Sequence, residues 1–271
     1  MVNAFSFCLY GGENRKYYQG LLENIGLIGK YFPTWKVYVY YGPDVTEPML
    51  NHLAACSSVV LRATNELGPV NMIHRFYAID EPDVEIMMVR DADSRVHWKD
   101  RWAIREFVVS ECNAHTIRDN VEHTASMMGG LWGLKKAAGI NIHEEYAYFK
   151  NNPNEKHGIG HDQNFLQECI YPKVRPFLLV HYSNDRVRLG EKHAVEFPFD
   201  WTNDVYCGRV ELEYLDYPEP PVKRKFALPT ALVRIRDAAP PSQPPPAPPS
   251  PALPPMIPTP NVPILNFLHR K

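Results

Sequence analysis

The sequence lacks the features of a secreted, membrane-spanning or disulfide-rich protein. Its N-terminus has neither the basic nor the apolar stretch of a signal peptide, and no apolar run is long enough to cross a bilayer. Its five cysteines are an odd, widely spread set without a Cys-x-x-Cys pair, which fits reduced thiols better than a disulfide framework. We therefore expect a soluble, cytoplasmic protein.

Strong charge, metal-binding histidine spacing and internal repeats are also missing. The formal net charge of -2 argues against bulk binding of nucleic acid. The histidines do not form a His-Glu-x-x-His pattern, which excludes that type of zinc site. A length of 271 residues is enough for one domain with a sizeable core plus an appendage.

Proline, by contrast, is abundant and concentrated at one end of the chain. Most of the 26 prolines follow residue 217, and they are densest between residues 240 and 263. Such a composition favours extended polyproline II and cannot form a packed core. We predict a domain over residues 1–217 and a proline-rich linker or tail over residues 218–271. An SH3-type ligand, or a spacer leading to further domains, remains an alternative for the second segment.

Hydrophobic periodicity predicts alternating strands and helices in the first segment. The predicted strands are residues 4–10, 36–41, 58–61, 84–89, 115–118, 127–134 and 177–181, and the predicted helices are residues 14–31, 46–55, 66–79, 98–111, 142–150 and 162–169. This alternation is typical of an α/β fold with a mostly parallel central sheet flanked by helices. Ligands of such sheets bind beyond the carboxyl ends of the strands.

Asp91-Ala92-Asp93 follows an apolar strand directly and is the most informative short motif. Carboxylates two residues apart on an extended backbone project to the same side. Hard divalent cations such as Mg²⁺ or Mn²⁺ prefer oxygen ligands and often combine one or two carboxylates with substrate phosphates. The alternative is a network in which Arg90 and Arg95 pair with the aspartates and merely close the strand end.

Three further positions offer chemistry, each with a plain structural alternative. Paired glycines at Gly129 and Gly130 indicate close approach of a ligand or of another backbone, and Trp132 offers a flat face for a sugar or a core side chain. Asp162 opens a predicted helix, either as its N-cap or as a general base. His181 ends a strand, as a possible third metal ligand or as a satisfied polar residue.

In combination, several segments resemble a known family, the small GT-A-type glycosyltransferases of large algal viruses and some bacteria. The closest likeness is to the N-terminal glycosyltransferase domain of a multidomain chlorovirus protein, over about residues 3–205. The segments are residues 5–11, Tyr17-Tyr18, residues 32–35, His74-Arg75-Phe76, residues 90–95, Arg118-Asp119, residues 129–133, residues 161–166 and His181. The resemblance implies a GT-A-like nucleotide-sugar-binding fold.

The resemblance also implies a metal-dependent enzyme that moves a sugar from a UDP-sugar donor to a hydroxyl of a glycan acceptor, in the host cytoplasm if the source is viral. Mn²⁺ or Mg²⁺ would be bound by Asp91 and Asp93, with His181 as third ligand. Asp162 would be the base of an inverting displacement. The donor would contact the following residues: Leu9, Tyr10, Gly11 and Tyr17 at the base and ribose, Arg75, Arg90 and Ala92 near the phosphates, and Gly130 and Trp132 at the sugar.

Other functions remain open at the level of sequence. A retaining enzyme would use Asp162 to contact the donor sugar instead. A nucleotidyltransferase or a phosphoesterase would use the same metal chemistry, and a non-catalytic module would bind a nucleotide or carbohydrate without turnover. His161 and Tyr182, next to the proposed base and the proposed third ligand, depart from the small or acidic residues expected in the family, so sugar or acceptor preference could differ.

Overall fold

The computed structural model describes residues 1–12, 14–151, 160–183, 191–198 and 205–210. All of these belong to one unit, Met1–Phe226. The predicted proline-rich linker or tail, residues 218–271, lies outside the described residues, and the domain boundary at residue 217 stays a prediction.

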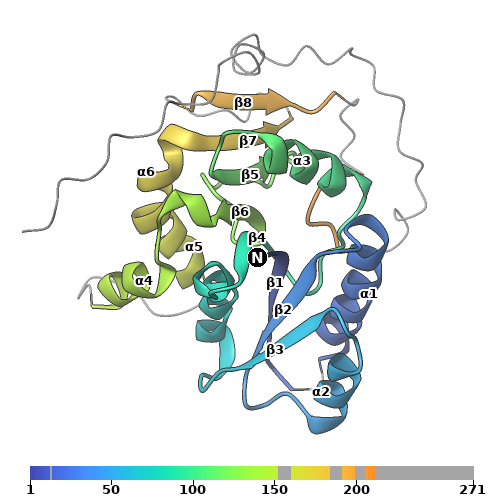
Figure 1. The fold of residues 1–271 in the computed structure, drawn as a ribbon. Helices are drawn as coiled ribbons and strands as arrows, with labels where there is room; N and C mark the ends of the chain where they lie inside the picture. The colour runs from blue at the N-terminus through green and yellow to red at the C-terminus, as the bar shows by residue number, and fades with distance from the viewer. Residues whose placement is uncertain (13, 152–159, 184–190, 199–204, 211–271) are drawn as a thin grey trace, which may run out of the picture. The chain divides into compact units, whose positions relative to one another are not determined.

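The centre of the described structure is an eight-stranded sheet with the strand order β3-β2-β1-β4-β6-β5-β7-β8 (Figure 1). β6 runs antiparallel to both of its neighbours, and the other pairs are parallel. This topology confirms the predicted α/β class with a mixed, mostly parallel sheet. The strands are β1 (Val2–Leu9), β2 (Lys36–Tyr41), β3 (Val59–Ala63), β4 (Val84–Arg90), β5 (Ala114–Arg118), β6 (Leu131–Lys135), β7 (Leu178–Tyr182) and β8 (His193–Glu196).

Helices cover both faces of this sheet (Figure 1). One face carries α1 (Arg15–Tyr31), α2 (Glu47–Ala54) and α3 (Trp98–Val109). The other carries η1 (Gly68–Asp80), α4 (Ile142–Lys150), α5 (His161–Phe165) and α6 (Tyr171–Val174), together with the short turns η2 (Lys136–Ala138), η3 (Leu166–Ile170) and η4 (Arg175–Phe177).

The strand feeding the aspartates is apolar over residues 86–89 because its two faces pack against different helices. In β4, Met87 and Val89 join the cluster under η1 and α4–α6, whereas Ile86 and Met88 join the cluster under α1–α3. A strand buried on both faces needs apolar residues at every position rather than at alternate ones. The residues that follow β4 therefore emerge from a rigid, central element.

Several predicted elements differ from the structure in type or extent. The predicted helix over residues 66–79 is the 3₁₀ helix η1, Gly68–Asp80, which begins two residues later than predicted. In such a helix residues three apart lie one above the other, which places Met72 and Arg75 on the same side. Of the predicted strand 127–134 only the part from Leu131 onward is a strand, and the predicted helix 162–169 is divided into α5 and the π-helical turn η3. The strand β8 was not predicted.

Two predictions from composition can be compared with the described residues. No helix among them is both long enough and apolar enough to cross a membrane. The five cysteines are free thiols, as expected from their number and spacing.

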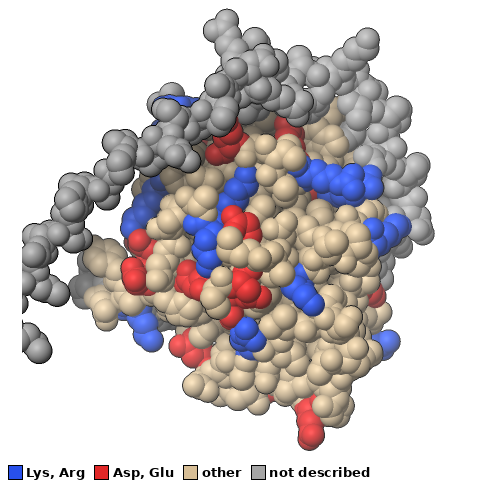
Figure 2. All heavy atoms as spheres, viewed as in Figure 1, with Lys and Arg blue, Asp and Glu red and all other residues tan. Residues whose placement is uncertain are grey.

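On the face drawn in Figure 2, acidic and basic side chains lie intermingled, and neither sign forms a continuous field.

Candidate functional site

A pocket of about 260 Å³ lies at the carboxyl ends of the neighbouring parallel strands β1 and β4. It is lined by Cys8, Tyr10, Tyr17, Met72, Arg75, Asp91, Ala92 and Asp93. Six of these residues are among the thirteen predicted site residues, so the structure brings part of the predicted site together at this pocket. The strand ends supply Cys8 and Tyr10, and η1 supplies Met72 and Arg75 from above.

The two aspartates lie in a tight turn rather than on an extended strand. β4 ends at Arg90, and the backbone N–H of Ser94 donates to the carbonyl of Asp91 at 3.2 Å. Helix α1 holds this turn closely, since a Cβ on Gly20 would lie 2.3 Å from the carbonyl oxygen of Ala92. The expectation that both carboxylates project from an extended backbone was therefore wrong, although both line the pocket.

Each aspartate is paired with a different basic side chain. The Nη1 atom of Arg75 donates to Asp91 Oδ1, whereas Lys16 Nζ lies 2.7 Å from Asp93 Oδ2. The side chain of Asp91 is 46% exposed and that of Asp93 is 15% exposed. The alternative of an arginine–aspartate network is thus partly realised, but through Arg75 rather than through the neighbouring arginines. Arg95 instead pairs with Glu23 at 2.6 Å.

Arg75 connects the aspartate turn to Asp162. Its Nη2 atom donates to Asp162 Oδ2 at 2.9 Å while Nη1 holds Asp91, so one buried guanidinium joins two carboxylates from distant parts of the chain. Burial acts to lower the pKa of Arg75, but Asp91 and Asp162 outweigh it, and the pKa lies above its ordinary value. The side chain of Asp162 is only 6% exposed, and α5 begins at His161 with Gly160 as its N-cap. Asp162 is therefore not the helix cap.

The glycine pair marks the close approach of these charged groups to the chain. A Cβ on Gly130 would lie 2.1 Å from Asp91 Oδ2, and a Cβ on Gly129 would lie 3.0 Å from Asp162 Oδ2. The N–H of Gly129 donates to Gln163 Oε1 at 2.9 Å, which fixes the loop against α5. Glycine at both positions leaves the space that the Asp91, Arg75 and Asp162 cluster occupies.

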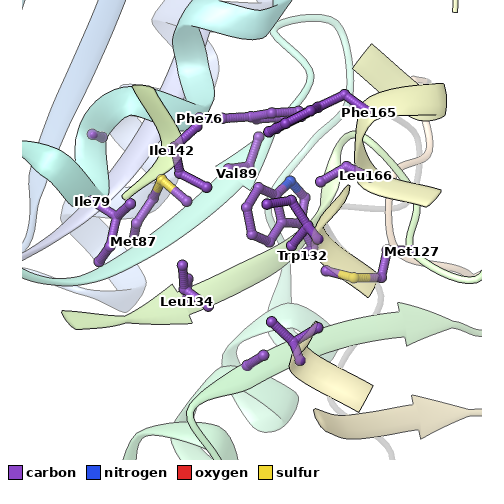
Figure 3. Close-up of a cluster of buried hydrophobic side chains, with 14 of the residues drawn as sticks. Phe76, Ile79, Met87, Val89, Met127, Trp132, Leu134, Ile142, Phe165 and Leu166 are labelled. Atoms are coloured by element: carbon purple, nitrogen blue, oxygen red, sulfur yellow. The ribbon is translucent and has the colours of Figure 1, made fainter. Parts of the chain in front are cut away.

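Two residues predicted to contact the donor lie in the protein interior instead. Trp132 has no exposed surface. Its ring packs edge-on against that of Phe76, with the ring centroids 5.0 Å apart, within the buried cluster of Figure 3. Arg90 is 1% exposed, and its Nε donates to Asp100 Oδ1 at 3.0 Å. In this arrangement Trp132 offers no surface to a sugar, and Arg90 is not at the pocket. Both are explained by packing.

His181 is not brought to the aspartates. Its ring nitrogens Nδ1 and Nε2 lie 2.8 Å from His115 Nε2 and 2.8 Å from Glu106 Oε2, so protein groups occupy both. β5 and β6 separate its strand, β7, from β4. The residue has no exposed surface and is the satisfied strand-end histidine that the sequence left open as an alternative. We therefore do not assign it as a ligand of a metal at Asp91 and Asp93.

The first strand contributes backbone and aromatic groups to the pocket rim. Leu9 is 2% exposed and packs in the core, so its side chain is not available to a ligand. Gly11 has φ +88° and donates its N–H to Asp44 Oδ2 at 2.8 Å. Tyr17 is 37% exposed, and burial raises the pKa of Tyr10 to about 12, so that hydroxyl stays protonated at neutral pH. An aromatic surface therefore borders the charged part of the pocket.

No protein-family model matches the chain, and no curated protein does. Among solved structures, it is similar to a glycosyltransferase involved in the glycosylation of the major capsid of PBCV-1, with 13% identity and a TM-score of 0.46 over 67% of this chain and 82% of the other. It is also similar to the glycosyltransferase GlyE of Streptococcus pneumoniae TIGR4, with 12% identity and a TM-score of 0.45 over 66% of this chain and 45% of the other. A third similar structure is the 4-diphosphocytidyl-2C-methyl-D-erythritolsynthase of Anaerococcus prevotii, with 8% identity and a TM-score of 0.46 over 70% of this chain and 91% of the other. At these values the function must be argued from the residues of the site.

Sequence reasoning missed Lys16, Cys8 and Met72 as members of the site. Lys16 stands in the first turn of α1, two residues after the cap Asn14, and only the fold shows that this turn faces Asp93. Cys8 donates its thiol to the carbonyl of Asn71 at 3.1 Å, and burial raises its pKa to about 12. It is therefore a lining residue rather than a nucleophile. For Cys8, its position near the end of β1 was an available signal, whereas Lys16 and Met72 lie in helices.

One other group of potential metal ligands converges within the part of the chain that the structure describes. His97, Asp100 and Cys207 place ligand atoms within 4.8 Å of one another. His97 Nδ1, however, accepts the N–H of Lys99 at 3.1 Å, while Asp100 accepts from Arg90 and from the N–H of His97. Burial raises the pKa of the Cys207 thiol well above its ordinary value. We interpret this group as the capping box that begins α3.

Proposed function

We propose that the chain is a metal-dependent glycosyltransferase that moves a sugar from a UDP-sugar donor to a hydroxyl of a glycan acceptor with inversion. The supporting observation is the pocket itself. At the carboxyl ends of two parallel strands it combines two carboxylates, a buried arginine and an exposed aromatic ring, contributed by Asp91, Asp93, Arg75 and Tyr17. This is the edge of an α/β sheet at which ligands bind.

The donor set of the pocket fits a hard divalent cation. Asp91 and Asp93 offer carboxylate oxygens, which Mg²⁺ and Mn²⁺ prefer, and the 46% exposure of Asp91 leaves it open to the pocket. In this proposal the two residues hold the cation, which when bound stabilises the charge that develops on the leaving diphosphate. Arg75 orients Asp91 and supplies a positive charge beside the phosphates. Tyr17 and the backbone around Gly11 bind the base and ribose.

Asp162 is the proposed general base. The acceptor hydroxyl gives its proton to the Asp162 carboxylate as its oxygen bonds to the anomeric carbon of the donor. The bond between that carbon and the diphosphate oxygen breaks at the same time, and UDP leaves. Arg75 holds one oxygen of Asp162 in a defined position, 2.9 Å from Nη2. Positioning of this kind is what general base catalysis requires.

A donor screen on the full-length chain tests the proposal. Thermal stability would be measured across nucleotide sugars with and without Mn²⁺, because a ligand at a hundred times its Kd stabilises the fold by about 2.7 kcal/mol. We expect stabilisation by UDP-sugars that depends on Mn²⁺, together with release of UDP in the presence of an acceptor. The variant Asp91→Ala/Asp93→Ala should lose both effects, whereas Asp83→Asn, at the opposite end of β4, should keep them.

Other products would identify the other functions. Release of pyrophosphate would indicate a nucleotidyltransferase, and release of free phosphate a phosphoesterase. Binding without any turnover would indicate a non-catalytic module. Full transfer by Asp91→Ala/Asp93→Ala would refute the metal site, as would UDP binding that is unaffected by Mn²⁺.

A further inference from the structure

Two basic side chains, Arg75 and Lys16, pair with aspartates that line the pocket, and they differ in how they are held. Arg75 is 5% exposed and paired with two carboxylates, Asp91 and Asp162, so it is fixed on both sides. Lys16 has a side chain that is 53% exposed and, among the residues that the structure describes, pairs with one carboxylate, that of Asp93, at 2.7 Å. A long, solvated side chain with a single partner can exchange that partner at small cost. Lys16 is therefore the cation of the pocket that can move.

The position of Lys16 keeps it near the pocket when it leaves Asp93. It follows the N-cap Asn14, whose side chain accepts the N–H of Lys16 at 3.2 Å, so its backbone is anchored in the first turn of α1. Its ammonium lies 5.4 Å from the ring centre of Tyr17, which lines the same pocket. An ammonium on this anchored stem can reach an anion in the pocket mouth without any movement of the helix.

Formal charges show why a divalent cation would cause Lys16 to exchange Asp93 for another partner. Three carboxylates, Asp91, Asp93 and Asp162, pair with two cations, Arg75 and Lys16, so this set of described residues carries one net negative charge. A diphosphate would be repelled by that charge. A divalent cation on the two aspartates reverses the sign, and it competes with Lys16 for the same carboxylate, Asp93.

We propose that Lys16 is a partner-exchanging residue: it neutralises Asp93 before the divalent cation binds, and afterwards it contacts the diphosphate of the nucleotide. This inference depends on the proposed function, since it assigns a further donor-binding residue to the same site. It predicts opposite effects of one substitution on the two ligands. Removing the ammonium frees Asp93 for the cation but removes a contact from the nucleotide.

The experiment compares Lys16→Met with wild type in the full-length chain, using Mn²⁺ alone and then UDP at saturating Mn²⁺ as probes. Titration calorimetry should show tighter binding of Mn²⁺ by Lys16→Met and weaker binding of UDP by about fivefold to tenfold, the value of one charge-assisted hydrogen bond to a partly exposed group. Lys16→Arg should restore UDP binding. Lys30→Met is the matched control, since Lys30 also lies beside a tyrosine ring but in the last turn of α1.

The outcomes separate this inference from the function on which it depends. Wild type that binds neither Mn²⁺ nor UDP would overturn both. Wild type that binds both ligands, with UDP affinity unchanged in Lys16→Met, would overturn the role of Lys16 and leave the proposed function intact. An equal loss of UDP affinity in Lys30→Met would also overturn it, because the effect would then be nonspecific charge removal.

Discussion

Arg75 determines how the charged residues of the site are arranged. It is the group that joins the turn after β4 to α5, through Asp91 on one side and Asp162 on the other. A buried guanidinium suits this position because its planar fork can donate to two carboxylates at once, which an ammonium cannot do as well. Any substitution at either aspartate must therefore be interpreted together with its effect on Arg75.

Asp162→Asn separates the proposed base from a purely positioning role. The amide keeps an oxygen that can accept from Arg75 Nη2 but cannot take the acceptor's proton. We expect UDP affinity with Mn²⁺ to stay within about threefold of wild type, while transfer falls by roughly a hundredfold or more. Calorimetry and initial rates measure the two quantities. If UDP affinity falls as far as transfer does, Asp162 positions Arg75 and is not the base.

Gly130→Ala tests the close approach at the aspartate turn. The added Cβ would lie 2.1 Å from Asp91 Oδ2, so the carboxylate must move, and Mn²⁺ affinity should fall by about tenfold or more. Mn²⁺ titration measures this directly. Gly26→Ala in α1 is the control, because its Cβ would meet nothing within 4 Å and alanine favours a helix. Unchanged Mn²⁺ affinity in Gly130→Ala would contradict the assignment of Asp91 as a ligand.

Residue identity alone indicated some members of the site and not others. Asp91, Arg75 and Asp162 were named from the sequence, and the structure joins them, although their roles stay proposals. Trp132 and His181 also carry suitable chemistry, but tertiary packing places both in the interior. Sequence gives the functional groups available, whereas burial decides which of them a ligand can reach, and burial depends on contacts between distant segments.

At the scale of elements, the order of the strands places the site. β1 and β4 are far apart in sequence but adjacent and parallel in the sheet, so Tyr10 and the aspartate turn meet at one edge. The apolar runs predicted both strands to within two residues at each end, because most positions of each strand are apolar. It missed η1 as a 3₁₀ helix, since a pattern of buried residues over thirteen positions does not distinguish 3.0 from 3.6 residues per turn.

Asn24 is a buried contact through which α1 holds the residues that follow the aspartates. Its side chain has no exposed surface, donates to the carbonyl of Ser94 at 2.5 Å and accepts the N–H of Val96 at 2.9 Å. Asn24→Ala should lower the free energy of unfolding by about 2–3 kcal/mol, because it leaves two buried backbone groups without partners.

Urea denaturation measures this effect. The control is Gln19→Ala on the exposed side of the same helix, where the side chain donates to Glu23, and a change within about 0.5 kcal/mol is expected. A stability of Asn24→Ala equal to that of the control would show that the turn is held by its own hydrogen bonds rather than by α1.

At the scale of the whole molecule, the sheet buries ionised groups away from the site as well as within it. Asp119 has no exposed surface, lies 2.7 Å from Lys99 and accepts the N–H of Cys207 at 3.0 Å. These contacts tie the end of β5 to α3 and to the segment around Cys207. The sequence did not indicate these contacts, because Asp119 and Cys207 are distant in the chain and the segment Arg118-Asp119 carries no sign of which residues it meets.

This buried pair predicts how stability changes in acid. Burial acts to raise the pKa of Asp119, but Lys99 and then His123 outweigh it, so the folded pKa lies below the ordinary value of 3.8. A carboxyl group with a lowered folded pKa contributes stability that is fully present above its unfolded pKa. The contribution is lost as the pH falls below 3.8 toward the folded pKa. The free energy of unfolding of wild type should therefore decrease steeply in this window.

Asp119→Asn isolates this contribution from other acid-sensitive groups. The variant should be less stable than wild type at neutral pH, by about 3–5 kcal/mol for a broken buried pair, and the difference should shrink below pH 3.8. Urea denaturation at a series of pH values measures both curves, with Glu47→Gln at the exposed start of α2 as the matched control. A difference that stays constant with pH would mean that the Asp119 carboxylate does not stabilise the fold through its charge.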